Sequence, residues 1–194
     1  MKNFTLTLTG TAPLLMHNAQ LSDPLNRYVK EMKPISGKRN KTEEDHLAMA
    51  RIEFMGGLYY DTDLGPVMPA MNIEACLVEG AKRLKQGKNV ERGLQIIDQV
   101  TPLAYDGPRD IEGLWGDGES EFVARHSVRV MTSRVMRTRP MFNNWALEVS
   151  GIYDEALLDQ DTLDEICRLA GAFAGLGDWR PRFGKFTHEL EIEN

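Results

Sequence analysis

The chain has 194 residues, of which 42% are hydrophobic and 27% are charged, enough for one sizeable core. This composition excludes a disordered, collagen-like or coiled-coil protein. The net charge of -6 excludes a uniformly basic nucleic-acid coat, although it allows a local basic surface. Because no apolar run reaches the length of a membrane span and the amino end lacks a continuous apolar block, we expect a cytoplasmic protein that makes no membrane contact.

The first third of the sequence predicts a strand and two helices. Residues 2–9 alternate apolar and threonine side chains, as in a half-buried strand, which we expect at an edge or in a meander of an antiparallel sheet. Asp23, followed by a proline, predicts a helix start, and Pro34 predicts its end. Thr42 begins a capping-box pattern, so a second helix should run from there to the glycine pair at 56–57.

The middle of the sequence predicts a helix, a strand and a loop. Apolar residues recur at helical spacing over 71–86, where Asn72 is a plausible cap. Residues 94–103 are apolar and β-branched enough for a strand. The acidic stretch 105–123 carries several glycines and a proline, and we expect a long exposed loop there.

The last third predicts strands around one more helix. Residues 126–141 and 145–153 have the composition of strands, and 163–173 carry the apolar stripe of a helix. A glycine-rich loop at 175–184 follows, and residues 185–192 alternate as a final strand.

The resulting order is strand, insertion, helix, strands, helix, glycine-rich loop and strand. This is the order of a ferredoxin-like or RRM-like α+β fold, with an antiparallel sheet and helices on one face. We expect a single domain over 1–194, with a helical insertion at 18–65 after the first strand and the acidic loop at 105–123.

Basic side chains concentrate in two segments. Residues 27–41 carry six of them, and residues 125–144 contain arginines but no acid. The arginines are Arg125, Arg129, Arg134, Arg137 and Arg139. All but Arg134 would share one face of an unbroken strand, so a bulge or turn is expected near 132–133. Such a face suits a polyanion in a groove or contacts between copies of the protein, and solvated charges clustered by chance are the alternative.

The loop GLGDWRPRFG is the most informative stretch. Its candidate binding residues are Gly175, Gly177, Arg180, Arg182 and Gly184. Glycines permit close backbone approach, and guanidinium groups beside backbone N–H donors suit a polyanion backbone. A Walker loop is excluded because the lysine followed by serine or threonine is absent. The alternative is a tight connection in which Trp179 and Phe183 are packing anchors.

The sequence contains no catalytic or metal-binding motif. The four histidines have no metal-ligand spacing, and the two cysteines, Cys76 and Cys167, suit buried free thiols, so neither a metal nor a cofactor is expected. His17 follows a proline-containing turn near the possible anion groove, where an acid/base role in RNA cleavage is conceivable and a structural or exposed role is the alternative.

Three stretches together resemble the RAMP superfamily, which includes the backbone subunits of CRISPR effector complexes. LTLTGTAPLLMHN at 6–18 is similar to the family's first strand and following turn. GPVMPAMNIEACLVEGAKRL at 65–84 is similar to its proline-led first helix, and GLGDWRPRFGKF at 175–186 to its glycine-rich loop. Compact stand-alone chains of this kind suggest a phage or prophage source.

The resemblance implies an RRM-like core that binds single-stranded RNA or DNA along its backbone and assembles head to tail into a filament. It places Met71, Asn72 and Lys82 at or near an anion contact of the first helix. The glycine-rich loop would be formed by Gly175, Gly177, Arg180, Arg182 and Gly184. The sequence departs from the family where Glu74 follows Asn72, since many members have a serine-rich, lysine-bearing helix start. The family's catalytic histidine pattern is also missing.

These observations predict a non-enzymatic, sequence-tolerant single-stranded nucleic-acid binding protein that oligomerises. One alternative is a self-assembling or partner-binding protein whose arginine face docks on an acidic protein surface. The other is a metal-independent endoribonuclease that uses His17.

Overall fold

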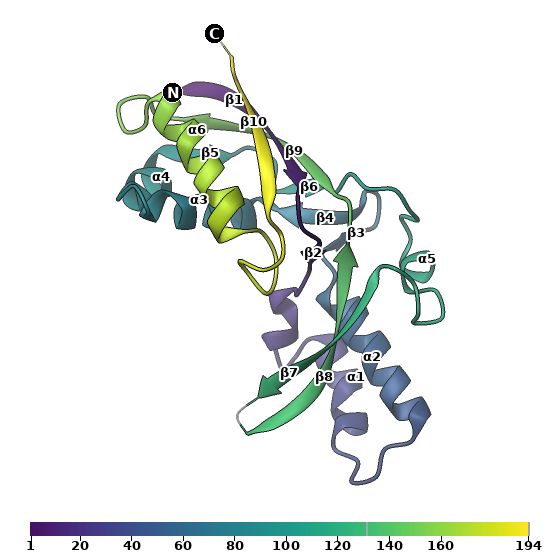
Figure 1. Cartoon of the computed structure of the whole chain (residues 1–194). Coiled ribbons are helices and arrows are strands. Elements are labelled where there is room, and N and C mark those ends of the chain that lie inside the picture. The colour runs from purple at the N-terminus through teal and green to yellow at the C-terminus, as the bar shows by residue number, and fades with distance from the viewer. Residues whose placement is uncertain (131, 194) are drawn as a thin grey trace.

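A four-stranded antiparallel sheet organises the upper part of the molecule (Figure 1). The computed structural model describes residues 1–130 and 132–193, with only the backbone of Val130. The strands, in their order across the sheet, are β10 (Phe186–Ile192), β1 (Lys2–Gly10), β9 (Ala146–Tyr153) and β5 (Leu94–Ile96). Helices lie between β1 and β5 and again between β9 and β10, so the chain follows the ferredoxin-like order and the α+β prediction is confirmed.

Strand β1 lies in the centre of this sheet. It pairs with β10 on one side and with β9 on the other, so the expected position at an edge or in a meander is wrong. Phe4, Leu6 and Leu8 are buried beneath the helices. The alternation of side chains reports how many faces of a strand are buried, and it contains no information on how many neighbours the strand has.

Two helices cover the buried face of the sheet. They are α3 (Ala70–Lys82) and α6 (Gln160–Leu169), and the latter continues as a π-helical turn, η2 (Ala170–Ala174). Asn72 does not cap α3, because the helix begins two residues earlier after Pro69. Both cysteines are buried in this layer, and burial raises the pKa of Cys76 to about 12.

The open face of the sheet is polar and acidic. Its side chains, which alternate with the buried ones, are Asn3, Thr5, Thr7, Thr9, Gln95, Glu148, Ser150, Ile152, Thr187, Glu189 and Glu191. We call this surface the acidic sheet face. RRM domains bind RNA on the corresponding face through aromatic side chains, but here its strand residues include neither an aromatic nor a cationic side chain. A polyanion would therefore be repelled from it.

The insertion after β1 forms a separate helical layer in the lower part of the molecule (Figure 1). Its elements are β2 (Leu14–Leu15), a 3-10 helix, η1 (Ala19–Ser22), α1 (Arg27–Ser36) and α2 (Glu43–Gly57). Thr42 and Asp45 form the predicted capping box of α2. Helix α1 begins later and ends later than expected, because Asp23 accepts from Leu25 N–H in a turn, Asn26 provides the cap, and Pro34 lies inside the last turn.

Shorter elements connect the insertion to the sheet. They are β3 (Tyr60–Asp61), β4 (Gly65–Pro69), α4 (Gly87–Gly93), β6 (Val100–Pro102) and α5 (Ile111–Trp115). The strand expected at 94–103 is split, since β6 leaves the main sheet to pair with β4. The acidic stretch is not an exposed loop throughout, because Leu114 and Trp115 of α5 are buried. No helix among the described residues is long and apolar enough to cross a membrane.

Strands β7 (Val123–Val130) and β8 (Ser133–Phe142) form a long hairpin beside α2, which turns where the sequence predicts an interruption (Figure 1). The turn divides the arginines between two faces. Arg129 lies opposite Arg134, on the face that includes Arg125, whereas Arg137 and Arg139 share the other face with His126. The arginines therefore do not share the single face that an unbroken strand would have given them.

The glycine-rich loop packs against the β2 segment through its backbone. Asp178 N–H donates to the Leu15 carbonyl and Gly184 N–H donates to the Pro13 carbonyl, each at 2.8 Å. Gly175, Gly177 and Gly184 all have positive φ, and a Cβ at each would meet a backbone carbonyl. Gly177 therefore allows the loop to approach β2, while Gly175 and Gly184 allow the two ends of the loop to lie against each other.

We expect Gly184→Ala to lower the free energy of unfolding by about 3 kcal/mol or more, because φ is +69° and the new methyl group would overlap the Leu176 carbonyl. The matched control is Gly37→Ala, at an exposed position with φ of -77°, which should change stability by less than about 0.5 kcal/mol. Urea denaturation followed by circular dichroism measures both. Equal effects would contradict the packing role of Gly184.

Candidate nucleic-acid interface

A buried carboxylate fastens the hairpin to helix α2. Glu53 is 8% exposed, and it accepts hydrogen bonds from the Arg137 guanidinium and, at 2.9 Å, from Thr138 N–H. The ion pair fixes Arg137 on the hairpin face that looks toward α1. A buried charge needs such partners, since an isolated one is strongly destabilising.

A second ion pair joins the hairpin to the glycine-rich loop. Arg139 Nε lies 3.0 Å from Asp178 Oδ2, and the Arg139 side chain is only 14% exposed. Arg139 Nη1 also donates to the Thr138 carbonyl at 3.3 Å. Segments far apart in the sequence, β8 and the glycine-rich loop, therefore meet at one guanidinium group.

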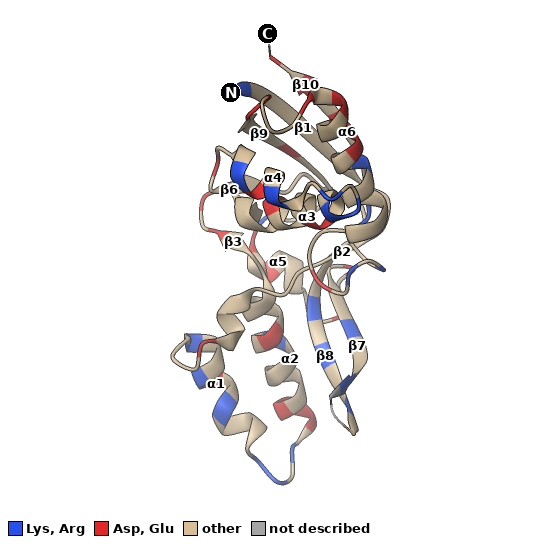
Figure 2. Ribbon diagram, turned by 90° about the vertical axis from the view of Figure 1, so that its left-hand side faces the viewer, with Lys and Arg blue, Asp and Glu red and all other residues tan. Residues whose placement is uncertain are grey.

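These contacts border a cavity of about 400 Å³ between α1, α2 and β8, which we call the basic cavity. Lys33, Arg137 and Arg139 line it, against the single carboxylate of Glu53. His17 lies at one end. The positive charge is notable in a protein whose net charge is -6. Figure 2 shows the wider pattern, with basic residues along α1, the α1–α2 loop and the hairpin, and acidic residues along α6.

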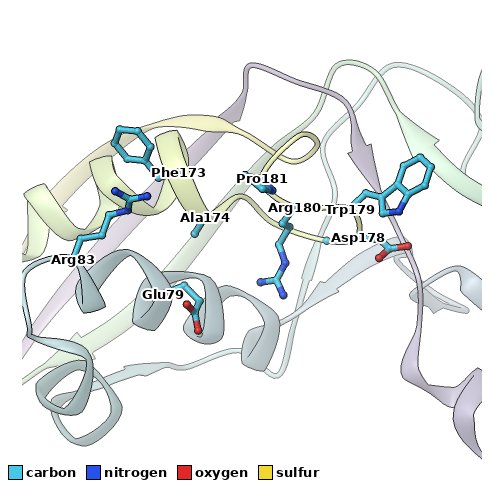
Figure 3. Close-up of a pocket in the computed structure, with 9 residues that line it drawn as sticks. Glu79, Arg83, Phe173, Ala174, Asp178, Trp179, Arg180 and Pro181 are labelled. Atoms are coloured by element: carbon cyan, nitrogen blue, oxygen red, sulfur yellow. The ribbon is translucent and has the colours of Figure 1, made fainter. Parts of the chain in front are cut away.

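A second cavity of about 540 Å³, the loop cavity, lies between α3 and the glycine-rich loop (Figure 3). The Arg83 guanidinium sits 4.2 Å from the centre of the Phe173 ring on one side. Arg180 extends from the loop toward α3, where Glu79 is located, whereas the Trp179 ring points away (Figure 3). Arg83 and Arg180 are balanced by Glu79 and Asp178, so the lining is neutral.

A smaller space of about 210 Å³, the connecting cavity, joins the other two. It shares His17 with the basic cavity, and Asp178 and Arg180 with the loop cavity. Asn72 lies on its wall. The connecting cavity thus shares lining residues with both of the others, and we call the three cavities together the groove.

His17 stands at the junction of the basic and connecting cavities. Partial desolvation of its ring, followed by the positive charge of Arg139, lowers the pKa of His17 below its ordinary value of 6.5, while Asp178 and Glu53 oppose the shift. The imidazole is therefore neutral at pH 7. A bound anion would raise this pKa, because it would offset the charge of Arg139.

An aromatic cluster borders the loop on its other side. The Trp179 and Phe183 rings stack with centroids 5.9 Å apart, and the His126 ring lies 5.0 Å from that of Trp179. This contact supports the interpretation of Trp179 and Phe183 as packing anchors. Trp179 is nevertheless 40% exposed, and thus part of its surface is open to a ligand.

The remaining candidate residues lie outside the groove or at its margin. Arg125 is 3.5 Å from Glu119 on the opposite hairpin face, and Arg129 and Arg134 lie near the hairpin tip. Lys82 pairs with Glu79. Arg182 is exposed, and neither it nor Arg180 forms an ion pair or side-chain hydrogen bond with another described residue.

Residues missed as binding candidates are Glu53, Asp178, Lys33 and Arg83. Glu53 carries a weak signal in the sequence, a charged residue inside the otherwise apolar stretch at the end of α2. The ion pairs of Glu53 and Asp178 leave no signal in the sequence, because pairs formed between distant segments of the fold have no fixed sequence spacing. Among the described residues, no group of three His, Cys, Asp or Glu side chains gathers as metal ligands would.

No family model matches the sequence, and no curated protein matches it. Forty-nine chains of solved structures do match. One is a chain in the cryo-EM structure of the Type III-B Cmr-beta bound to cognate target RNA, with a TM-score of 0.52 and 11% sequence identity. The match covers 98% of this chain and 60% of that one, and at this identity it shows a shared fold alone.

Proposed function

We propose that this protein binds single-stranded nucleic acid in the groove without reading its sequence, and that it does so as a non-catalytic, RAMP-like subunit. The observation that carries the proposal is the groove itself, in which Lys33, Arg137, Arg139 and Arg180 converge from three separate segments. The likeness to a chain of an RNA-bound complex supports it. The acidic sheet face does not match a polyanion in charge, whereas the basic cavity within the groove has three cationic side chains for one carboxylate.

The internal ion pairs are compatible with this role because they use only part of each guanidinium group. A guanidinium has five N–H donors. Arg137 commits Nη1 to Glu53, and Arg139 commits Nε to Asp178, so further donors remain for phosphate oxygens. Such contacts hold a strand by its backbone, and they carry no information about its bases.

The paired variant Arg180→Ala and Arg182→Ala tests the loop end of the groove. It should weaken binding to every single-stranded RNA and DNA alike, roughly tenfold at 0.1 M salt. If each arginine contacts one phosphate, the slope of log affinity against log salt should fall in magnitude by about 1.4. Fluorescence anisotropy with labelled oligonucleotides measures both quantities.

The control is Arg92→Ala, which removes one positive charge on α4, outside the groove. It should leave the salt dependence close to that of the wild type. Failure of the wild-type protein to bind either nucleic acid at low salt would refute the proposed function. A loss confined to one oligonucleotide sequence would instead contradict backbone recognition.

His17 should make binding depend on pH. Because a phosphate in the groove would raise the low pKa of His17, binding takes up a proton and affinity should increase as the pH falls from the bound-state pKa toward the lower pKa of the free protein. His17→Gln should flatten this dependence while retaining binding at pH 7.5. The comparison of the two proteins by anisotropy from pH 7.5 to 5.5 removes the effect of other titrating groups, and parallel curves would exclude His17 from the groove contact.

A second candidate function is contact between copies of the chain, arranged head to tail. The acidic sheet face, with Glu148, Glu189 and Glu191, is complementary in charge to the arginines near the hairpin tip. Light scattering without nucleic acid should then show assembly at 50 mM salt that dissolves by about 0.5 M, and Glu189→Lys should reduce it. A monomer at all salt concentrations would exclude this contact.

A further inference from the structure

Strand β10 lies at an edge of the four-stranded sheet. Among the described residues, β1 pairs with one side of β10 and no strand pairs with the other. Glu193 N–H donates to the Asn3 carbonyl at 3.1 Å, which fixes the hydrogen-bonded pairs of the β1–β10 ladder. Because such pairs alternate along an antiparallel ladder, the N–H and C=O groups of His188, Leu190 and Ile192 point away from β1. These groups are available to a further strand.

The opposite edge of the sheet is closed by a side chain. Strand β5 is three residues long, and its Ile96 N–H donates to Glu74 Oε1 at 2.9 Å. On β10, η2 covers only the beginning of the strand, where Gly171 packs closely against the Phe186 carbonyl. Among the described residues, no side chain accepts from the outward N–H groups farther along the strand. We call this stretch, residues 188–192, the β10 edge.

Two kinds of side chain flank the β10 edge. Glu189 and Glu191 are exposed on the acidic sheet face. Leu190 and Ile192 lie on the other side of the strand, where they pack against the core but are only half-buried. A strand added here would extend the core over the two apolar side chains, and it would meet carboxylates on its polar side.

The charge around the β10 edge selects the class of occupant. Asp164 Oδ1 of α6 lies 3.0 Å from His188 Nε2, and Figure 2 shows further acidic residues along α6. Nucleic acid would be repelled from such a surface. Two copies paired through β10 would place Glu189 and Glu191 opposite glutamates, and like charges in directly opposite positions are destabilising. A cationic strand has the matching charge.

We propose that the β10 edge binds an extended segment of a partner protein in which lysine or arginine alternates with apolar side chains. The segment adds a fifth strand to the sheet, and its main chain provides most of the affinity. Its cationic side chains lie beside Glu189 and Glu191, and its apolar side chains cover Leu190 and Ile192. This site is a protein-binding site and does not depend on the proposed function.

The first test uses a labelled, capped peptide of alternating lysine and valine, and a second peptide with glutamate in place of lysine. At about 50 mM salt, fluorescence anisotropy should show binding of the lysine peptide alone. Glu189→Lys should weaken this binding roughly fivefold. The control Glu148→Lys reverses a charge on the same face two strands away, and it should change the affinity less than about twofold.

Two results of this test would refute the β10 edge as a docking site. One is the absence of binding of the lysine peptide to the wild-type protein. The other is an equal loss of affinity in Glu189→Lys and Glu148→Lys, which would mean that the peptide responds to the charge of the whole face.

Methylation of backbone nitrogens distinguishes an added strand from an ionic contact. In a strand on the β10 edge, alternate N–H groups of the peptide point toward the protein and the others point toward solvent. Methylation of one alternate set should therefore abolish binding, while methylation of the other set should preserve it. The sensitive set reports the direction of the added strand. Equal effects of the two sets would contradict strand addition.

Hydrogen exchange followed by NMR observes the same contact from the protein, without a variant. With the lysine–valine peptide bound, the amides of His188, Leu190 and Ile192 should exchange at least about tenfold more slowly. The amides of Glu189 and Glu191 point toward β1 and should change little. Unchanged exchange at all five positions would refute the proposal.

The same measurement without peptide identifies a second copy as the alternative occupant. If protection of the outward amides increases with protein concentration, β10 pairs with another copy and the assignment to a cationic partner is overturned. Nucleic acid is absent from all these experiments, so their outcome leaves the proposed function of the groove untouched.

Discussion

The groove depends on two carboxylates that hold two arginines in place. Glu53 fastens Arg137 and the backbone of β8 to α2, and Asp178 fastens Arg139 to the glycine-rich loop. These pairs add to the packing of β8 against α2 and to its pairing with β2, which is two residues long. The ion pairs neutralise part of the positive charge of the two arginines, and they fix the positions of the remaining guanidinium N–H donors. Donors that are already fixed lose less entropy when a ligand binds.

The division of charge between surfaces follows from the same architecture. The ferredoxin-like sheet buries one face under α3 and α6 and leaves threonines and glutamates on the other. Basic side chains lie instead along α1, the α1–α2 loop and the hairpin, and around α3 and α4 (Figure 2). The fold is therefore of the RRM type, but the candidate binding surface lies beside the sheet, where the insertion and the hairpin meet the glycine-rich loop.

Much of the fold was predictable because it depends on local patterns. The alternation in β1, the capping box of Thr42 and the helical spacing in α3 can each be recognised within a short stretch of sequence. The predicted elements were wrong where the sequence contained more than one local signal. Asp23 accepts a hydrogen bond in a turn and Asn26 provides the cap instead. The acidic stretch contains α5, which Asp110 caps and which buries Leu114 and Trp115.

By itself, the sequence determined the order of elements, the charge segregation and the interruption of the arginine-rich stretch, all properties of neighbouring residues. Only the tertiary structure decided which arginines share a surface. Because of the turn in the hairpin, Arg137 and Arg139 lie on one face and Arg125 and Arg129 on the other. The ion pairs with Glu53 and Asp178 then hold Arg137 and Arg139 at the groove. These pairs join residues that are 39 and 84 positions apart in the sequence. Electrostatic attraction depends on distance in space and not on sequence separation, so no sequence pattern predicts which residues will pair.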